Sequence, residues 1–190
     1  WFQPIWVVSL FQTTVCTVAS EHAQQAKKVF EALQYQSLLS LELLTEVQNC
    51  FAPNGWQQLE ILYYPSVSLS EDDPKHQVSK LYREHPEYPK YSQEFSGGTY
   101  VIFDQSNEII SWAGIKDHGA INEIAVGTIP EHRKKGIGKA VVACAVDDIL
   151  LRGHVPVYVP DAVTNHGSYA LAKSLGFEKI GEMLLWEIQR

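Results

Sequence analysis

The sequence is poor in cysteine, and the few cysteines it has form no recognisable pattern. Cys16, Cys50 and Cys144 are odd in number and far apart, and no C-x-x-C pair lies beside a histidine cluster. This spacing argues against a disulfide framework and against a zinc site built from cysteine and histidine. We therefore expect reduced, mostly buried thiols in a cytoplasmic protein, and we predict no metal site.

Positive charge and long apolar runs are also scarce. Lysine and arginine number 15 against 22 aspartate and glutamate residues, and the formal net charge is −7. Nonspecific nucleic-acid binding needs a positive field, so we predict no DNA or RNA partner, although a local basic loop stays open. Apolar runs such as 140–146 are far shorter than the roughly 20 residues that cross a bilayer, so we predict no membrane partner.

The 190 residues suffice for one domain, or for a compact core with a sizeable extension. The chain begins at Trp1 and its only methionine is Met183, so we expect that the natural start has been removed. Removal of a targeting segment is one alternative that the sequence leaves open.

The first half gives weak structural signals. β-Branched and aromatic residues in 5–18 predict one or two strands. After Ser20, a candidate N-cap, the apolar spacing predicts an amphipathic helix with Ala26, Val29, Phe30 and Leu33 on one face. Further expectations are a helix within 38–51, a strand or a helix over 56–64, and a loop-rich stretch over 65–95 with a short helix near 77–84.

The second half gives clearer structural signals. Glycines, turn residues and apolar runs predict strands at 99–104, 109–115, 121–126, 155–159 and 177–188, with a turn at 116–119, a helix from Gly138 to Gly153 and another over 165–174. Only the step from 121–126 to 155–159 needs parallel strands. We therefore predict an α/β (α+β) fold with a mixed, mostly antiparallel sheet flanked by helices.

The loop before the first of these helices carries the main functional signal. Gly136 and Gly138 allow a close backbone approach, and the N-terminus of the new helix faces the same place. Basic residues surround these glycines at Arg133, Lys134, Lys135 and Lys139. The pattern predicts a cradle for a phosphate group, and the alternative is a plain turn with solvated basic side chains.

Two nucleotide motifs fail on spacing, since neither the Walker pattern nor the dinucleotide fingerprint fits the loop. The run Arg133-Lys-Lys-Gly136-Ile-Gly138 instead resembles the R/Q-x-x-G-x-G/A signature of the GNAT superfamily of acyl-CoA-dependent N-acyltransferases. Downstream, Asn165-x-x-Ser168-x-x-Leu171 followed by Leu175-Gly176-Phe177 is similar to the superfamily's N-x-x-[AS]-x-x-L…GF helix. The resemblance covers 97–190, and in residues 1–96 we identify no family pattern.

The resemblance implies a GNAT-like sheet in which the strand ending at Val126 carries a bulge and splays from 155–159, opening a slot for pantetheine. Backbone groups of Val126 and Thr128 would pair with the pantetheine amides, and the amides of 133–138 would hold the pyrophosphate. The implied set for acetyl-CoA comprises Val126, Gly127, Thr128, Arg133, Lys134, Lys135, Gly136, Ile137, Gly138, Lys139, Asn165 and Ser168. Asn165 as a helix cap and Ser168 as a packing residue are the alternatives.

The implied reaction is direct attack of a primary amine on the thioester of acetyl-CoA, through a tetrahedral intermediate. The amine must lose a proton, and Glu123 is our candidate base, directly or through water. The alternative for Glu123 is a solvent-facing strand carboxylate. Asp117 and His118, in the preceding turn, are weaker candidates.

The superfamily commonly supplies a proton donor for the leaving thiolate from a tyrosine seven residues after the helix asparagine, which here is Ala172. Tyr169 is our catalytic candidate in its place, and Tyr158 is a second. Both have packing roles as the alternative, and the thiolate could also leave unassisted. His132, His154 and His166 show no ligand spacing, and we interpret them as surface or capping residues.

We therefore predict a GNAT-type N-acetyltransferase, with an acetyl-CoA core over 97–190 and an acceptor site shaped by 1–96. Its partners would be acetyl-CoA and an amine whose identity is open. A second hypothesis is a noncatalytic acyl-CoA-binding or regulatory module. A third is that 1–96 form a degenerate second domain that makes a homodimer.

Overall fold

The computed structural model describes residues 5–10, 13–31, 45–46, 49, 55–65, 76–161 and 164–187. The strands within them are β1 (Ile5–Leu10), β2 (Thr13–Val18), β3 (Gly55–Tyr63), β4 (Ser79–Lys80), β5 (Gly98–Phe103), β6 (Ile109–His118), β7 (Ile121–Thr128), β8 (Val155–Tyr158) and β9 (Glu178–Glu187). The helices are α1 (Ala23–Glu31), α3 (Tyr88–Glu94), α4 (Ile137–Leu151) and α5 (His166–Ser174), with 3-10 turns η1 (Ser20–His22) and η2 (Pro130–His132).

Hydrogen bonds connect these strands in the order β2-β1-β9-β3-β8-β7-β6-β5-β4. β7 and β8 run parallel, whereas β5–β6, β6–β7, β3–β8 and β1–β9 run antiparallel. The mixed, mostly antiparallel sheet with flanking helices confirms the predicted fold class. By their contacts, the residues form two compact units, one of 1–61, 160–166 and 179–190, the other of 62–159 and 167–178.

The first unit contains the strands expected within residues 5–18. Ile5 pairs with Val18 and Leu10 with Thr13, so the stretch forms two strands, and β1 also pairs with β9. α1 buries Ala26 and Val29, as the apolar spacing predicted. Ser20 is not the N-cap, because it lies inside η1. Leu33 and most of the expected helix within 38–51 fall outside the described residues.

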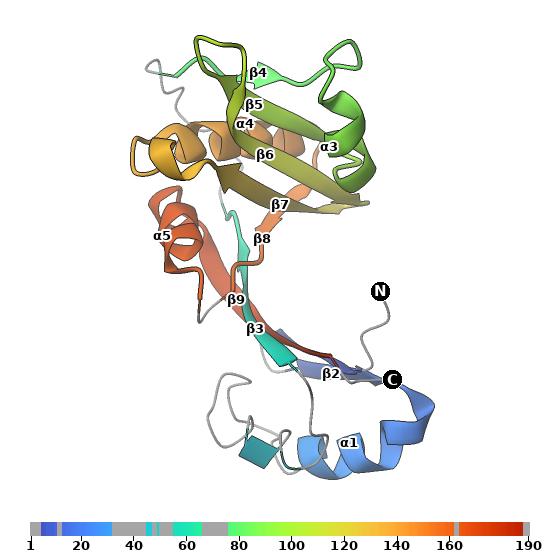
Figure 1. Cartoon of the computed structure of the whole chain (residues 1–190). Coiled ribbons are helices and arrows are strands. Elements are labelled where there is room, and N and C mark those ends of the chain that lie inside the picture. The colour runs from blue at the N-terminus through green and yellow to red at the C-terminus, as the bar shows by residue number, and fades with distance from the viewer. Residues whose placement is uncertain are drawn as a thin grey trace. The chain divides into compact units, whose positions relative to one another are not determined.

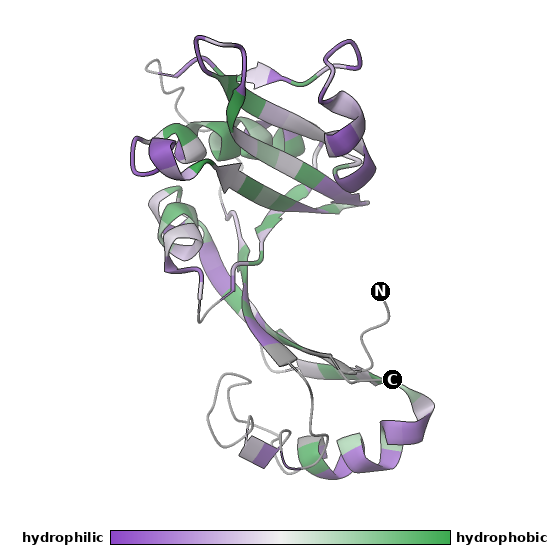
Figure 2. Ribbon diagram, in the orientation of Figure 1, coloured by the Kyte–Doolittle hydropathy of each residue, from purple (hydrophilic) through white to green (hydrophobic). Residues whose placement is uncertain are grey.

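The second unit is a sheet with different helices on its two faces (Figure 1). Alternating residues of β5, β6 and β7 pack against α4, which buries the apolar residues Ile137, Ala140, Val141, Val142, Ala145, Val146 and Ile149. The opposite face packs on α3, where Tyr91 and Phe95 contact the ring of Trp112. Figure 2 shows α4 as largely apolar and the loop before it as hydrophilic.

Two expectations for this unit are wrong. The stretch near 77–84 is not helical; it contains β4, and the short helix is α3, which begins next to Pro89. Proline is compatible with the first turn of a helix, where its missing N–H would have no partner anyway. The turn expected at 116–119 is shorter, because β6 runs to His118 and β7 begins at Ile121.

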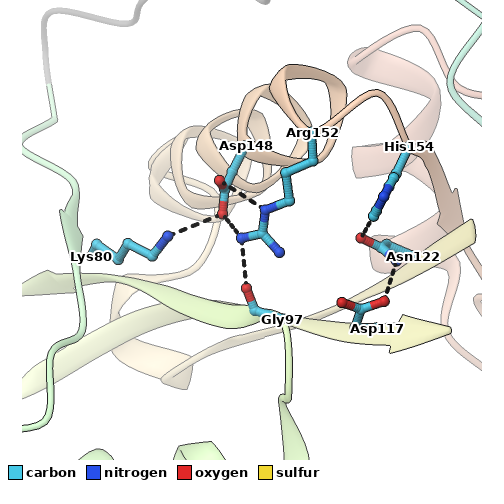
Figure 3. A network of polar contacts seen from close by, with 7 residues as sticks. All are labelled: Lys80, Gly97, Asp117, Asn122, Asp148, Arg152 and His154. Atoms are coloured by element: carbon cyan, nitrogen blue, oxygen red, sulfur yellow. Dashed lines mark hydrogen bonds and ion pairs between the residues drawn. The ribbon is translucent and has the colours of Figure 1, made fainter. Parts of the chain in front are cut away.

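The C-terminal end of α4 is tied to the sheet by an ion-pair network (Figure 3). Asp148 accepts hydrogen bonds from Lys80 at 3.2 Å and from the guanidinium of Arg152, which also donates to the carbonyl of Gly97 at 2.8 Å. Burial alone would raise the pKa of Asp148, but bonds from Arg152, Tyr100 and Lys80 outweigh it and hold that pKa below its ordinary value. The network therefore holds the C-terminal end of α4 against β4 and the start of β5.

Candidate functional site

The parallel pairing of β7 with β8 stops partway along β7. Ile121 pairs with Val155, and the last pair is Ile124 with Tyr158, whereas β7 continues to Thr128. The four residues beyond Ile124 therefore have no partner on β8, which is the strand divergence that the resemblance implied. The implied bulge in β7 is absent, since its pairing with β6 runs from 121 to 128 without a register shift.

Backbone directions in β7 follow from two hydrogen bonds at its ends. The N–H of Ile129 donates to the carbonyl of Ile110 in β6, and the N–H of Val155, the first residue of β8, donates to the carbonyl of Ala120. Because residues alternate between neighbouring strands in a ladder, odd-numbered residues of β7 face β6 and even-numbered residues face β8. The N–H and C=O groups of Val126 and Thr128 thus point toward the side where β8 has diverged.

These groups form an open polar edge. The carbonyl of Thr128 accepts a hydrogen bond from Nε of Arg133 at 3.1 Å. Within the described residues, no strand pairs with Val126 on this side. Backbone N–H and C=O groups need partners when they are buried. The edge is therefore suited to an extended ligand that carries amide groups.

The loop between β7 and α4 has the left-handed geometry that its glycines suggested. Lys134 has φ of 61° and Gly136, the N-cap residue of α4, has φ of 84°. No side chain caps the helix, and its first internal bond runs from the N–H of Ala140 to the carbonyl of Gly136 at 3.1 Å. The amides of Ile137 and Gly138 precede that bond, so they and the helix dipole face outward as a site for an anion.

The basic residues of the loop have different surroundings. Nζ of Lys139 donates to the carbonyl of Ser174 at the end of α5, at 3.1 Å. Arg133 keeps its terminal nitrogens available after the bond from Nε. Lys134 and Lys135 are exposed. Arg133, Lys134 and Lys135 therefore supply exposed positive charge beside the helix N-terminus, while Lys139 connects α4 to α5.

Sequence reasoning missed a histidine that contacts this loop from a distant segment of the chain. Nε2 of His76 lies 3.1 Å from the carbonyl oxygen of Lys135, and a Cβ placed on Gly136 would come 3.4 Å from the same nitrogen. The contact joins segments 59 positions apart, so no local pattern predicts it. A second tight position is Gly138, where a Cβ would meet Thr128 Oγ1 at 3.1 Å and Leu171 Cδ1 at 3.2 Å.

Glu123 lies on the face of the sheet that also carries Trp112. Its carboxylate pairs with Nζ of Lys116 at 3.3 Å, across the β6–β7 register, and about a third of each side chain is exposed. Glu123 is therefore a half-buried, ion-paired carboxylate two residues before Ala125, where β7 leaves β8. The predicted role as a base stays a prediction.

The weaker base candidates lie at the turn of the β6–β7 hairpin, away from the open edge of β7 at Val126 and Thr128. Asp117 accepts hydrogen bonds from the N–H of Gly119 at 2.8 Å and from Asn122 at 3.1 Å, and Asn122 also contacts His154 (Figure 3). The bond from Gly119 and that from Asn122 lower the pKa of Asp117, which makes it a weaker base. His118 is exposed. The structure gives Asp117 a turn-forming role.

The tyrosine candidates have different positions. The hydroxyl of Tyr158, the last residue of β8, lies 2.7 Å from Oγ of Ser168 on α5. Tyr169 is half-buried and packs against the core beside α4. Ala172, the position of the superfamily's tyrosine, is fully buried in that core. Asn165 belongs to the first compact unit, where its N–H donates to the carbonyl of Asp161, and its contact with pantetheine stays a prediction.

Two further properties concern the part of the chain that the structure describes. No three histidine, cysteine, aspartate or glutamate side chains there form a group that could hold a metal ion. None of the helices described is long and apolar enough to cross a bilayer. Cys16 and Cys144 are half-buried thiols, and Cys50 lies outside the described residues.

Comparisons with known proteins agree with this geometry. Residues 62–185 match the family model for GNAT acetyltransferases. A stretch of 60 residues, 32% of this chain, is 33% identical to N-acetyltransferase family 8 member 3 of Rattus norvegicus and spans 26% of that protein. The chain therefore covers about a quarter of this curated relative.

Solved structures share the fold at low sequence identity. A GCN5-related N-acetyltransferase from Sphaerobacter thermophilus superposes with a TM-score of 0.65 at 11% identity, covering 95% of this chain and 75% of that one. A GNAT-family acetyltransferase from Novosphingobium aromaticivorans gives a TM-score of 0.59 at 19% identity, with 73% and 67% covered. These neighbours support the fold.

Proposed function

Because the chain belongs to the GNAT acetyltransferase family, we propose that it transfers an acetyl group from acetyl-CoA to a primary amine. The observation that carries this proposal is the open edge of β7 at Val126 and Thr128, which leads into the uncapped N-terminus of α4. This pair of features, in this order, is complementary to a chain of amide groups that ends in a diphosphate. The rat relative's name as an N-acetyltransferase supports an amine as the acceptor.

The residues present fit an acyl-CoA. The backbone of Val126 and the N–H of Thr128 would pair with its amides, and the amides of Ile137 and Gly138 would face its pyrophosphate. Arg133 would add charge-assisted hydrogen bonds. Bound there, acetyl-CoA would supply an activated acyl group, and the thiolate of coenzyme A would be the leaving group.

In the proposed chemistry, the amine nitrogen forms a bond to the acyl carbon, and the carbon–sulfur bond breaks through a tetrahedral intermediate. An amine that resembles lysine has a pKa of about 10.4, so its ammonium form must first lose a proton. Glu123 takes this proton directly or through water, and release from Lys116 makes its carboxylate available. Residues 1–96 are proposed to shape the acceptor site.

The test is a thiol-release assay with acetyl-CoA and a panel of amines that includes polyamines, aminoglycosides and lysine peptides. An acetyltransferase releases coenzyme A thiol with at least one amine. Gly138→Trp serves as the blocked variant, because any side chain at Gly138 meets Thr128 and Leu171. Cofactor binding without thiol release from any amine would favour a noncatalytic acyl-CoA-binding module instead.

A further inference from the structure

A buried hydroxyl group lies beside the end of the open edge of β7. Ser111 of β6 is 0% exposed, and in the register of the hairpin it pairs with Thr128, the last residue of β7. Its Oγ lies 2.9 Å from Oγ1 of Thr128 and donates to the carbonyl of Gly127 at 3.2 Å. Both contacts of this buried hydroxyl therefore go to the last two residues of β7.

The two contacts together define which hydroxyl is the donor. A hydroxyl group has one proton to donate, and a carbonyl oxygen only accepts. Because Ser111 gives its proton to the carbonyl of Gly127, the hydroxyl of Thr128 donates to the oxygen of Ser111. The proton of Thr128 is then occupied, and the lone pairs of its Oγ1 are available to accept a hydrogen bond from a ligand.

Thr128 is oriented by side chains at a point where the ladder of the sheet does not orient it. As an even-numbered residue of β7, it directs its N–H and C=O away from β6. Its carbonyl accepts from Nε of Arg133, and its hydroxyl is held by Ser111. These two contacts therefore determine how Thr128 faces the open edge.

The hydroxyl of Thr128 lies where the open edge meets the N-terminus of α4. A Cβ placed on Gly138, in the first turn of α4, would come 3.1 Å from Oγ1 of Thr128. The oxygen is thus beside both parts of the proposed coenzyme site. In coenzyme A, the pantoate hydroxyl has the matching position, because it lies between the amides of the pantetheine arm and the diphosphate.

We infer that the side chain of Thr128 accepts a hydrogen bond from the pantoate hydroxyl of coenzyme A, and that Ser111 is the positioning residue that orients it. This inference rests on the proposed function, since it adds a contact to the same coenzyme. It is separate from the backbone pairing proposed for Thr128, because a variant without the hydroxyl keeps its N–H and C=O.

Isothermal titration calorimetry with coenzyme A tests the inference without turnover. Thr128→Val keeps the shape of the side chain but loses the acceptor, so the dissociation constant should rise by about 5- to 10-fold. Thr128→Ser, which keeps the hydroxyl, should stay within about twofold of wild type. Ser111→Ala should give a smaller rise, and adding it to Thr128→Val should cause no further loss, because both changes act through one oxygen. Thr99→Val is the matched control, since Thr99 is also buried but lies on β5.

Adenosine diphosphate is the second probe, because it carries the diphosphate and lacks the pantoate hydroxyl. Its affinity should be equal in Thr128→Val and in the wild type. An equal fall for both probes would indicate damage to the phosphate site and would overturn the inference. So would a dissociation constant of Thr128→Val for coenzyme A within about twofold of wild type.

The outcomes also separate this inference from the proposed function. If Ser111→Ala does not fold, as judged by circular dichroism, the half-buried Thr128 decides through the valine and serine variants. A wild-type protein that shows the expected binding pattern and releases thiol with no amine would remove the proposed transfer and support the inference. A wild-type protein that does not bind coenzyme A would overturn both.

Discussion

The imidazole of His76 is hydrogen-bonded to the carbonyl of Lys135, with 3.1 Å between Nε2 and the oxygen. Lys135 lies between Lys134 and Gly136, the two left-handed residues of the loop before α4. The bond therefore fixes the peptide that joins Lys135 to Gly136, and so the direction of the amides at the start of α4. A residue far away in the sequence thus orients the proposed phosphate site.

Replacement of His76 by alanine should weaken coenzyme A binding. One net hydrogen bond contributes about 0.5–1.5 kcal/mol, so we expect the dissociation constant to rise by about 2- to 10-fold. Isothermal titration calorimetry measures this change. His22→Ala, which removes a histidine from η1, is the control, and equal affinity in the two variants would contradict the role of His76.

Gly136→Ala should destabilise the protein, because alanine is strained at a φ of 84°. A residue other than glycine in this region costs on the order of 1–3 kcal/mol, and the new Cβ also meets His76. The matched substitution Gly167→Ala, inside α5 and with open space around it, should raise the free energy of unfolding by about 0.5–1 kcal/mol. Urea denaturation measures the free energy of unfolding of both variants. Equal changes in the two would contradict the left-handed conformation of Gly136.

Much of the site could be predicted because its signals are local. Glycines at 136, 153 and 176 all have positive φ, and they mark helix boundaries that the sequence placed correctly. The order of strands after residue 97 followed from turns and apolar runs. The parallel step from β7 to β8 followed from the helix between them.

What escaped prediction depends on distant segments or on competing local rules. α3 was missed because Pro89 indicates a loop when it is considered alone, whereas its position at the helix start makes it compatible with a helix. The contacts of His76 with Lys135 and of Tyr158 with Ser168 join separate elements. Prediction of the pair Lys116 and Glu123 would have required the length of the turn, because the turn determines the register of the hairpin.

Glu123→Gln should lower kcat at neutral pH by about 100-fold if the carboxylate is the base, in line with the usual contribution of general bases. The affinity for coenzyme A should not change, because Glu123 lies outside the proposed phosphate site. Loss of the partly exposed ion pair with Lys116 should change the free energy of unfolding by less than about 1 kcal/mol. Full activity of this variant would remove Glu123 from the mechanism.

The network around Asp148 predicts a dependence of stability on pH. The folded-state pKa of this carboxyl is lowered, so its contribution is present above the unfolded pKa of about 3.9 and is lost as the pH falls through the lower folded value. Between about pH 5 and pH 2, the wild-type protein should therefore lose more unfolding free energy than Asp148→Asn. Equal losses would contradict the network, and Glu94→Gln, exposed on α3, should behave as wild type.

The central claim is that coenzyme A lies along the open edge of β7 and ends at the N-terminus of α4. Hydrogen exchange resolved at single amides tests it most directly, with the protein saturated by coenzyme A. The account predicts slower exchange at Val126, Thr128, Ile137 and Gly138, and little change at Asn122, which is already buried. Unchanged exchange at these four amides, with protection appearing elsewhere, would contradict it.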